Sequence, residues 1–139
     1  VTRTAWCDRG PFTYPLSTDV SGNIWNHEVG VDGNGAASDA YITAAPMDIS
    51  DGEFNMDIFG FWPDIKEQVG ALSLYVLTRS RASEAPASEG PFALDASGNS
   101  VDLRISGKMA GFKIESNAVG GNFSLGINRG DAQPAGGRR

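Results

Sequence analysis

The strongest constraint on the fold is an alternation of apolar and polar side chains between Val101 and Ser116. The apolar residues occupy every second position on both sides of Ser106-Gly107, and they are Val101, Leu103, Ile105, Ala110, Phe112 and Ile114. Because successive side chains on a β-strand point to opposite faces, this spacing predicts two strands with one apolar face each. We interpret the pair as a β-hairpin whose apolar face packs against a second sheet.

Shorter period-two stretches, separated by turn-forming residues, predict strands at 4–7, 23–28, 40–45, 54–62, 72–77, 92–94 and 122–127, with an extended segment at 47–49. Their spacing of roughly 8 to 12 residues is typical of a sandwich or barrel. We therefore predict an all-β fold, an antiparallel β-sandwich that is jelly-roll-like. The best helical candidate, Ile65 to Val69, is too short to be stable alone. Residues Ala82 to Pro91 are expected to form a solvated loop.

The chain is expected to divide at residues 31–39, where small and polar side chains predict a linker. Residues 1–30 before it are rich in turns, residues 40–130 form the predicted sandwich, and residues 131–139 are a polar tail. The first ten residues lack both an initiator Met and the apolar core of a signal peptide. We therefore expect the chain to be a processed or excised piece of something longer.

Metal and cofactor sites are not predicted. The single Cys7 cannot form an internal disulfide, and the single His27 excludes a two-His metal site within one chain. Asp32-Gly33-Asn34-Gly35 has the composition of a calcium loop, and Asp48, Asp51 and Glu53 are a second possible cation site. The first lacks the ligand pattern of an EF-hand, and Asp and Gly are commoner in turns than in metal sites, so we interpret both as turns.

An enzyme is not predicted either. His27 is conceivable as a general base, but a hydrogen-bonded structural histidine between aromatic neighbours is the preferred interpretation. A glycosidase needs two acids across a cleft, and the candidates are Asp57, Asp64, Glu67, Asp102 and Glu115. Most of these acids fall on the polar side of amphipathic strands, where a solvated face explains them.

Aromatic and basic residues supply the binding candidates. Aromatic residues outside the regular alternation are typical of protein interfaces and sugar platforms, and the interface candidates are Trp6, Trp25, Phe61 and Trp62. The candidate platforms for stacking a sugar are Trp25, Trp62 or Tyr14. The net charge of −6 argues against DNA binding over the whole surface. The candidates for local contact with DNA or an acidic partner are Arg79, Arg81, Lys108, Arg138 and Arg139, although scattered solubilising charge is the preferred interpretation of these residues.

The order of several short motifs resembles the C-terminal part of tail nozzle, or packaged-DNA stabilisation, proteins of short-tailed bacteriophages. With breaks, the resemblance runs over most of the chain. The motifs are Trp6-Cys7-Asp8, Gly22 to Asp32, Met47 to Glu53, Trp62-Pro63-Asp64, Leu103 to Lys108, and the ending Pro134 to Arg139.

The resemblance implies a function without catalysis. Residues 1–30 would be the remnant of a propeller blade, and residues 40–130 would be the β-sandwich platform that attaches the nozzle to the adaptor ring. It further implies a homo-oligomeric ring in the virion tail, assembled in the host cytoplasm, that helps to retain and conduct DNA. The expected partners are neighbouring copies and the adaptor or portal-associated ring. The alternative function is a carbohydrate-binding module that recognises host surface glycans.

Overall fold

The computed structural model describes residues 2–49 and 54–136, and it contains two compact units, Val1–Val31 and Asp32–Arg139. The division falls at the start of the predicted linker. Within residues 31–39 the backbone forms an isolated bridge between Gly33 and Ala36 and no strand. The described residues contain no helix, and so none that could span a membrane.

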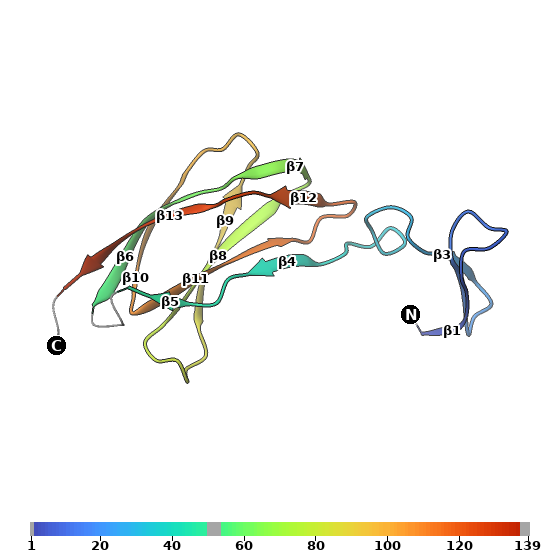
Figure 1. Ribbon diagram of the computed structural model, residues 1–139, viewed down its shortest axis with the longest axis horizontal. Helices are drawn as coiled ribbons and strands as arrows, with labels where there is room; N and C mark the ends of the chain where they lie inside the picture. Colours follow the sequence, from blue (N-terminus) through green and yellow to red (C-terminus); the bar gives the residue numbers. More distant parts are fainter. Residues whose placement is uncertain (1, 50–53, 137–139) are drawn as a thin grey trace. The chain divides into compact units, whose positions relative to one another are not determined.

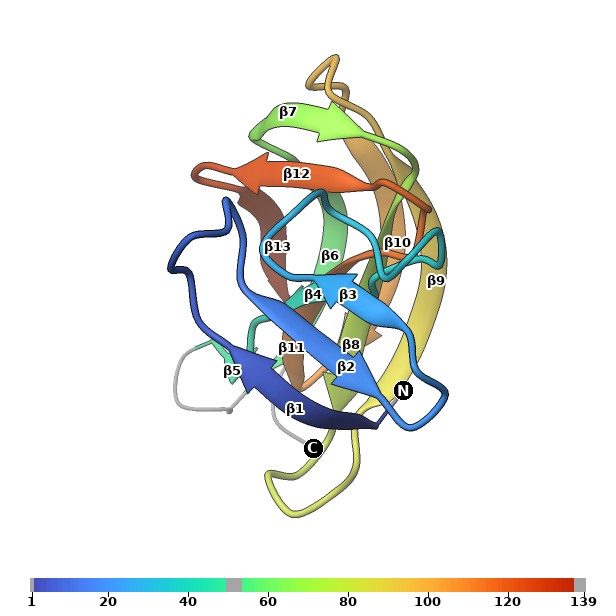
Figure 2. The same cartoon turned by 90° about the vertical axis from the view of Figure 1, so that its right-hand side faces the viewer.

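The first unit is a three-stranded antiparallel sheet in the order β1-β2-β3, whose strands lie side by side in Figure 2. The strands are β1 (Arg3–Cys7), β2 (Leu16–Asp19) and β3 (Ile24–Asn26). The sequence pattern predicts β1 and β3 and misses β2. The reason is that β2 buries the polar residues Ser17 and Asp19, so that its inward face carries no apolar signal. The propeller-blade origin of this unit stays a prediction.

The second unit is an antiparallel β-sandwich of two main sheets (Figure 1). The first sheet has the order β10-β6-β13, formed by Val101–Gly107, Asn55–Trp62 and Arg129–Ala135. The second has the order β4-β11-β8-β9, formed by Ala40–Thr43, Met109–Ser116, Leu72–Arg79 and Ala87–Leu94. The short β5 (Met47–Asp48) also pairs with β11, and a separate ladder joins β7 (Ile65–Val69) to β12 (Asn122–Leu125).

The core lies between the two main sheets. The first sheet contributes Met56, Ile58, Phe61, Leu103 and Ile105. The second contributes Leu72, Leu74, Val76, Leu94, Ala110 and Ile114. Both sheets therefore bury one face against the other, which confirms the predicted all-β antiparallel sandwich. The jelly-roll topology stays a prediction.

The predicted hairpin between β10 and β11 is wrong. The two strands lie in different sheets, because β10 pairs with β6 whereas β11 pairs with β8, β4 and β5. Gly107 and Lys108 carry the chain from one sheet to the other, and a Cβ on Gly107 would lie 3.1 Å from Cβ of Thr78 on β8. The apolar alternation correctly predicts the inward faces. It contains no information on which strand each face lies beside.

Two other predictions fail at exposed strands. The solvated loop ends early, since residues 87–91 belong to β9, and the polar tail of 131–139 begins with most of β13. Residues 65–69, rejected above as too short for a stable helix, form the strand β7, which the pattern does not predict. β13 pairs with β6 from Arg129 to Ala135, at one edge of the first sheet. An edge strand has a free side and needs few apolar residues, so its sequence resembles that of a loop.

Candidate functional site

The candidate site lies where a long two-stranded ribbon is interrupted. β6 leads into β7 and β12 leads into β13, and the β6–β13 and β7–β12 ladders are separated by Pro63-Asp64 on one side and residues 126–128 on the other. Pro63 has no backbone N–H, so the regular ladder cannot continue through it. The ribbon therefore needs other hydrogen bonds at this point.

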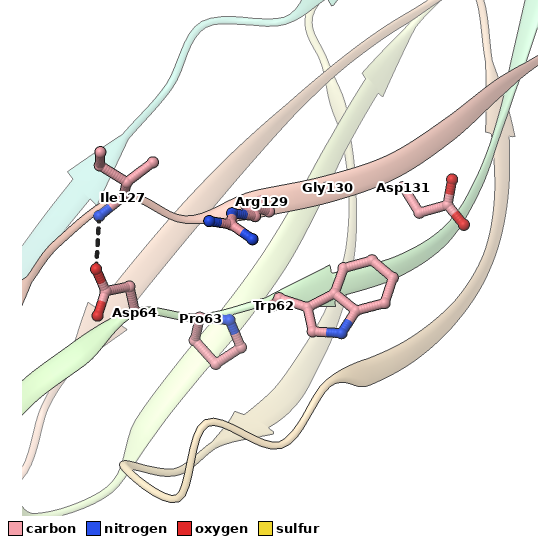
Figure 3. A pocket seen from close by; sticks show the side chains of 7 residues that line it. All are labelled: Trp62, Pro63, Asp64, Ile127, Arg129, Gly130 and Asp131. Atoms are coloured by element: carbon pink, nitrogen blue, oxygen red, sulfur yellow. Dashed lines mark hydrogen bonds between the residues drawn. The ribbon is translucent and has the colours of Figure 1, made fainter.

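Asp64 supplies most of those hydrogen bonds. Its carbonyl oxygen accepts from the Gly126 amide at 2.7 Å, and its carboxylate Oδ2 accepts from the Ile127 amide at 2.9 Å (Figure 3). Its own amide donates to Oδ1 of Asn128 at 2.9 Å. A Cβ on Gly126 would overlap the Asp64 carboxylate, so residue 126 must be glycine for this closure. The break is a fixed feature of the sandwich.

A hollow of about 780 Å³, open to solvent, lies beside this break. We call it the Trp62 hollow, and Figure 3 shows the residues that line it: Trp62, Pro63, Asp64, Ile127, Arg129, Gly130 and Asp131. Its volume lies within the 300 to 1,000 Å³ that is usual for small-molecule sites. An aromatic ring, two carboxylates and a guanidinium therefore share one concave surface.

The register explains why these side chains meet. Arg129 is paired with Trp62 and Asp131 with Gly60, and directly opposed or alternate residues of paired strands share a face. Trp62 is 42% exposed, and a Cβ on Gly60 would lie 2.9 Å from Cη2 of its indole. The absence of a side chain at residue 60 thus lets the ring lie over the strand, with Arg129 and Asp131 on the neighbouring strand.

The charged groups of the hollow keep free hydrogen-bonding capacity. Within residues 2–49 and 54–136, no salt bridge involves Arg129, Asp64 or Asp131. The Ile127 amide is the hydrogen-bond partner of Asp64 Oδ2, and a carboxylate has about four acceptor positions. The hollow can therefore offer both donors and acceptors to a ligand.

Among the four predicted interface residues, the prediction is wrong for Phe61. It is 2% exposed and packs in the core with its ring 4.9 Å from that of Phe112. Trp6 is 54% exposed on β1, whereas Trp25 is half-buried, with its indole N–H donating to Asp19 and the guanidinium of Arg3 over its ring. Trp6 and Trp62 thus remain open to a partner.

The structure brings three of the predicted basic residues to one end of the sandwich. Lys108 precedes Met109, which pairs with Arg79 on β8, and Arg81 follows that strand. Arg79 donates to the Ala82 carbonyl, and Arg81 lies 3.9 Å from Glu84. The β13 strand ends near this edge, since Pro134 and Gly107 both pair with Met56. Arg138 and Arg139 lie outside the described residues.

Sequence reasoning missed Arg129 and Asp131 as members of a site. Residues 129, 131 and 133 are polar and alternate with Gly130, Ala132 and Pro134, which is a period-two pattern without apolar residues. That alternation, directly after a predicted strand, is the signal that could have placed both side chains on one face.

The alternative sites have structural explanations. Oδ1 of Asp32 accepts from the Gly35 amide at 3.1 Å, which closes a turn at the calcium-like loop. Asp51 and Glu53 of the second possible cation site lie outside the described residues. Elsewhere, in the part of the chain that the structure describes, no three His, Cys, Asp or Glu side chains are grouped as metal ligands would be. Glu115 pairs with Lys113 rather than facing another acid.

His27 has the surroundings of a structural histidine. Its Nε2 is hydrogen-bonded to the Ser17 hydroxyl at 2.6 Å, and its ring lies 4.6 Å from that of Trp6. Ser17 is 2% exposed, so its hydroxyl is closed to a substrate. The pair stabilises the first unit, in agreement with the preferred interpretation of His27.

Asp19 makes the first unit sensitive to acid. Its carboxylate accepts from the side chain and backbone of Asn23, from the Trp25 indole and from the Ser21 amide, and these bonds lower its pKa from 3.8 to about 2. A carboxyl whose pKa is lower in the folded state stabilises the fold above its unfolded pKa. This contribution is lost as the pH falls from about 4 to about 2.

We expect Asp19→Asn to flatten the pH dependence of the first unit's stability in that window. The reason is that the amide cannot gain or lose the proton. The measurement is the NMR signal of the Trp25 indole N–H during denaturant titrations at a series of pH values. An equal loss of stability with acid in wild type and variant would contradict the role of Asp19.

Comparison with known proteins adds no relative: no family model matches the chain, and no curated protein was found to be similar.

Proposed function

We propose that this chain is a non-enzymatic structural and interaction module of a short-tailed phage tail, where it contributes to the nozzle ring or its attachment to the adaptor. The order of the motifs from Trp6 to Arg139 is the basis for the phage assignment. The structural observation that supports an interaction role is the open edge of the second sheet. Strand β4 pairs with β11 on one side only, and all four of its residues are exposed.

An edge strand of this kind can pair with another chain, since its outer N–H and C=O groups pair with no other strand among residues 2–49 and 54–136. Tyr41 and Ile42 on β4 are 64% and 55% exposed, and Met47 on β5 is 67% exposed. Monomers seldom leave such residues next to a free edge without a use. We infer that neighbouring copies or the adaptor ring cover this edge in the virion.

Side chains on the outer surface beside β4 contact one another. The ammonium of Lys113 lies 5.1 Å from the ring centre of Tyr41 and 5.5 Å from that of Tyr75. Lys113 also pairs with Glu115, and this hydrogen bond raises the pKa of the lysine above its usual value. Side chains held in place before contact lose less conformational entropy on binding. This arrangement favours a protein partner at the β4 edge.

Retention or passage of DNA is part of the same proposal. Arg79, Arg81 and Lys108 stand at one end of the sandwich, where they could contact phosphates without reading sequence. The acidic total of the chain would confine such contact to this end.

The assignment to a phage tail is tested by immunogold electron microscopy of virions produced from the genome that encodes this sequence. Antibodies against the purified chain are expected to label the tail. The same antibodies, after absorption with excess purified chain, are the control. Label confined to the capsid, or virions that carry no label above that control, would contradict the proposal.

One observation favours the second candidate function, a carbohydrate-binding module. The Trp62 hollow combines an exposed aromatic ring with free polar groups, which is the chemistry that recognises a sugar.

A further inference from the structure

We propose that the Trp62 hollow binds an uncharged pyranose unit of a polysaccharide, with the sugar ring stacked on the indole and its hydroxyl groups held by Asp131, Asp64 and Arg129. The inference rests on the second candidate function and names its ligand class and its contacts. It is independent of the assignment to a phage tail, since a tail component and another protein could use the same site.

The indole of Trp62 offers a flat apolar surface that is partly open to solvent. The outer edge of the ring lies against Gly60, whose missing side chain gives it room, and Trp62 keeps 42% of its surface exposed. A pyranose has a face of C–H groups, and burying this face on an aromatic ring removes apolar surface of both partners from water. The ring is also rigid, so that little side-chain entropy is lost on binding.

The polar groups match the hydroxyls of a sugar. Asp64 and Asp131 are acceptors when ionised, and the guanidinium of Arg129 is a donor only. Hydroxyl groups can donate to the carboxylates and accept from the guanidinium. Lining residues of both kinds beside one aromatic ring therefore suit a ligand that carries several hydroxyls.

The charges of the hollow favour an uncharged ligand. The two carboxylates of Asp64 and Asp131 outnumber the single guanidinium of Arg129 and would repel an anion such as a uronic acid. An ammonium group would be attracted by the carboxylates but repelled by Arg129, so these two effects partly cancel while the ammonium still loses hydration. An uncharged ligand meets neither the repulsion of the anion nor the hydration loss of the cation.

The test measures binding of the full chain to three sets of oligosaccharides: neutral hexose oligomers, uronate-containing oligomers and glucosamine oligomers. Binding is followed by NMR, through the indole N–H signals of Trp6, Trp25 and Trp62. We expect neutral oligomers to bind in preference and to shift the Trp62 signal. We expect Trp62→Ala to weaken this binding by about tenfold or more, which corresponds to about 1.4 kcal/mol or more of binding free energy.

Two further variants separate stacking from folding. Gly60→Ala keeps the indole but displaces it, since the added methyl would meet the ring's outer edge. We expect it to weaken binding while the unfolding transition of the second unit is retained. Trp6→Ala removes a somewhat more exposed indole from the first unit and should leave the affinity unchanged. If Trp62→Ala impairs folding, Gly60→Ala still decides whether the indole position matters.

Each failure has its own meaning. Preference for uronate or glucosamine oligomers would overturn the neutral class of ligand. Glycan binding that persists in both Trp62→Ala and Gly60→Ala, and is lost in Trp25→Ala or Tyr14→Ala, would overturn the site but keep the second candidate function. Absence of binding to all three sets would overturn both.

Discussion

Replacing Ile105 by alanine is expected to lower the free energy of unfolding of the Asp32–Arg139 unit by about 2 to 5 kcal/mol. Ile105 lies on β10, is 5% exposed and belongs to the core between the two main sheets. Its truncation removes apolar surface from the core and leaves a cavity, because the strands on both sides are held by their ladders. The measurement is urea unfolding followed through NMR signals of β8 and β11.

Ile127→Ala is the matched control. It removes the same atoms from the same unit, but Ile127 is 80% exposed, so we expect a change within about 0.5 kcal/mol. Phe112→Ala tests the opposite sheet, where the ring packs against Phe61. Losses below about half a kilocalorie per mole at both Ile105 and Phe112 would contradict the packing of these side chains between the two sheets.

Gly111→Ala is the second substitution with a large expected effect. A Cβ at residue 111 would overlap the Ala44 carbonyl oxygen and would lie 2.8 Å from the Pro46 nitrogen. These are backbone atoms, so no side-chain rotation can relieve the overlap. The chain between β4 and β5 must move away from β11, and we expect a loss of about 1 to 3 kcal/mol or more.

The readout is amide hydrogen exchange of Tyr41 to Thr43 together with urea unfolding of the second unit. Faster exchange in β4 should accompany the loss of stability, because the Ala44 amide donates to the Phe112 carbonyl at 2.8 Å in the same region. Gly33→Ala is the control, since the nearest atom to an added Cβ there is 3.8 Å away. Equal stability of the Gly111 and Gly33 variants would contradict the close approach of 44–46 to β11.

The inward faces of the sandwich could be predicted from sequence because a strand with one buried face has apolar residues at every second position. Ile58, Leu74 and Ile105 all stand in such alternation and all are buried. Strands without an apolar face lack this alternation and could not be predicted. β2 buries Ser17 and Asp19, and β13 is an edge strand with polar residues at 129, 131 and 133. The sequence also does not indicate which strands pair with each other, since β10 and β11 have the pattern of a hairpin but lie in opposite sheets.

The candidate site could be predicted only in part for the same reason. Trp62 was found because an aromatic residue at the end of a strand, followed by Pro63, falls outside the regular core pattern. The prediction that Phe61 is exposed is wrong. Neighbouring residues of a strand point to opposite faces, so only one of Phe61 and Trp62 can face solvent, and that residue is Trp62. Arg129 and Asp131 join the site through the β6–β13 ladder, which connects residues far apart in the chain.

The pairing of β6 with both β10 and β13 has a consequence for synthesis on the ribosome. β6 is translated well before either partner, and β13 is the last strand of the described chain. Pairing between distant segments also slows folding, because the intervening loop must be closed first. A nascent chain would therefore leave one edge of β6 unpaired until β13 has left the exit tunnel. Chaperone demand should peak during that interval.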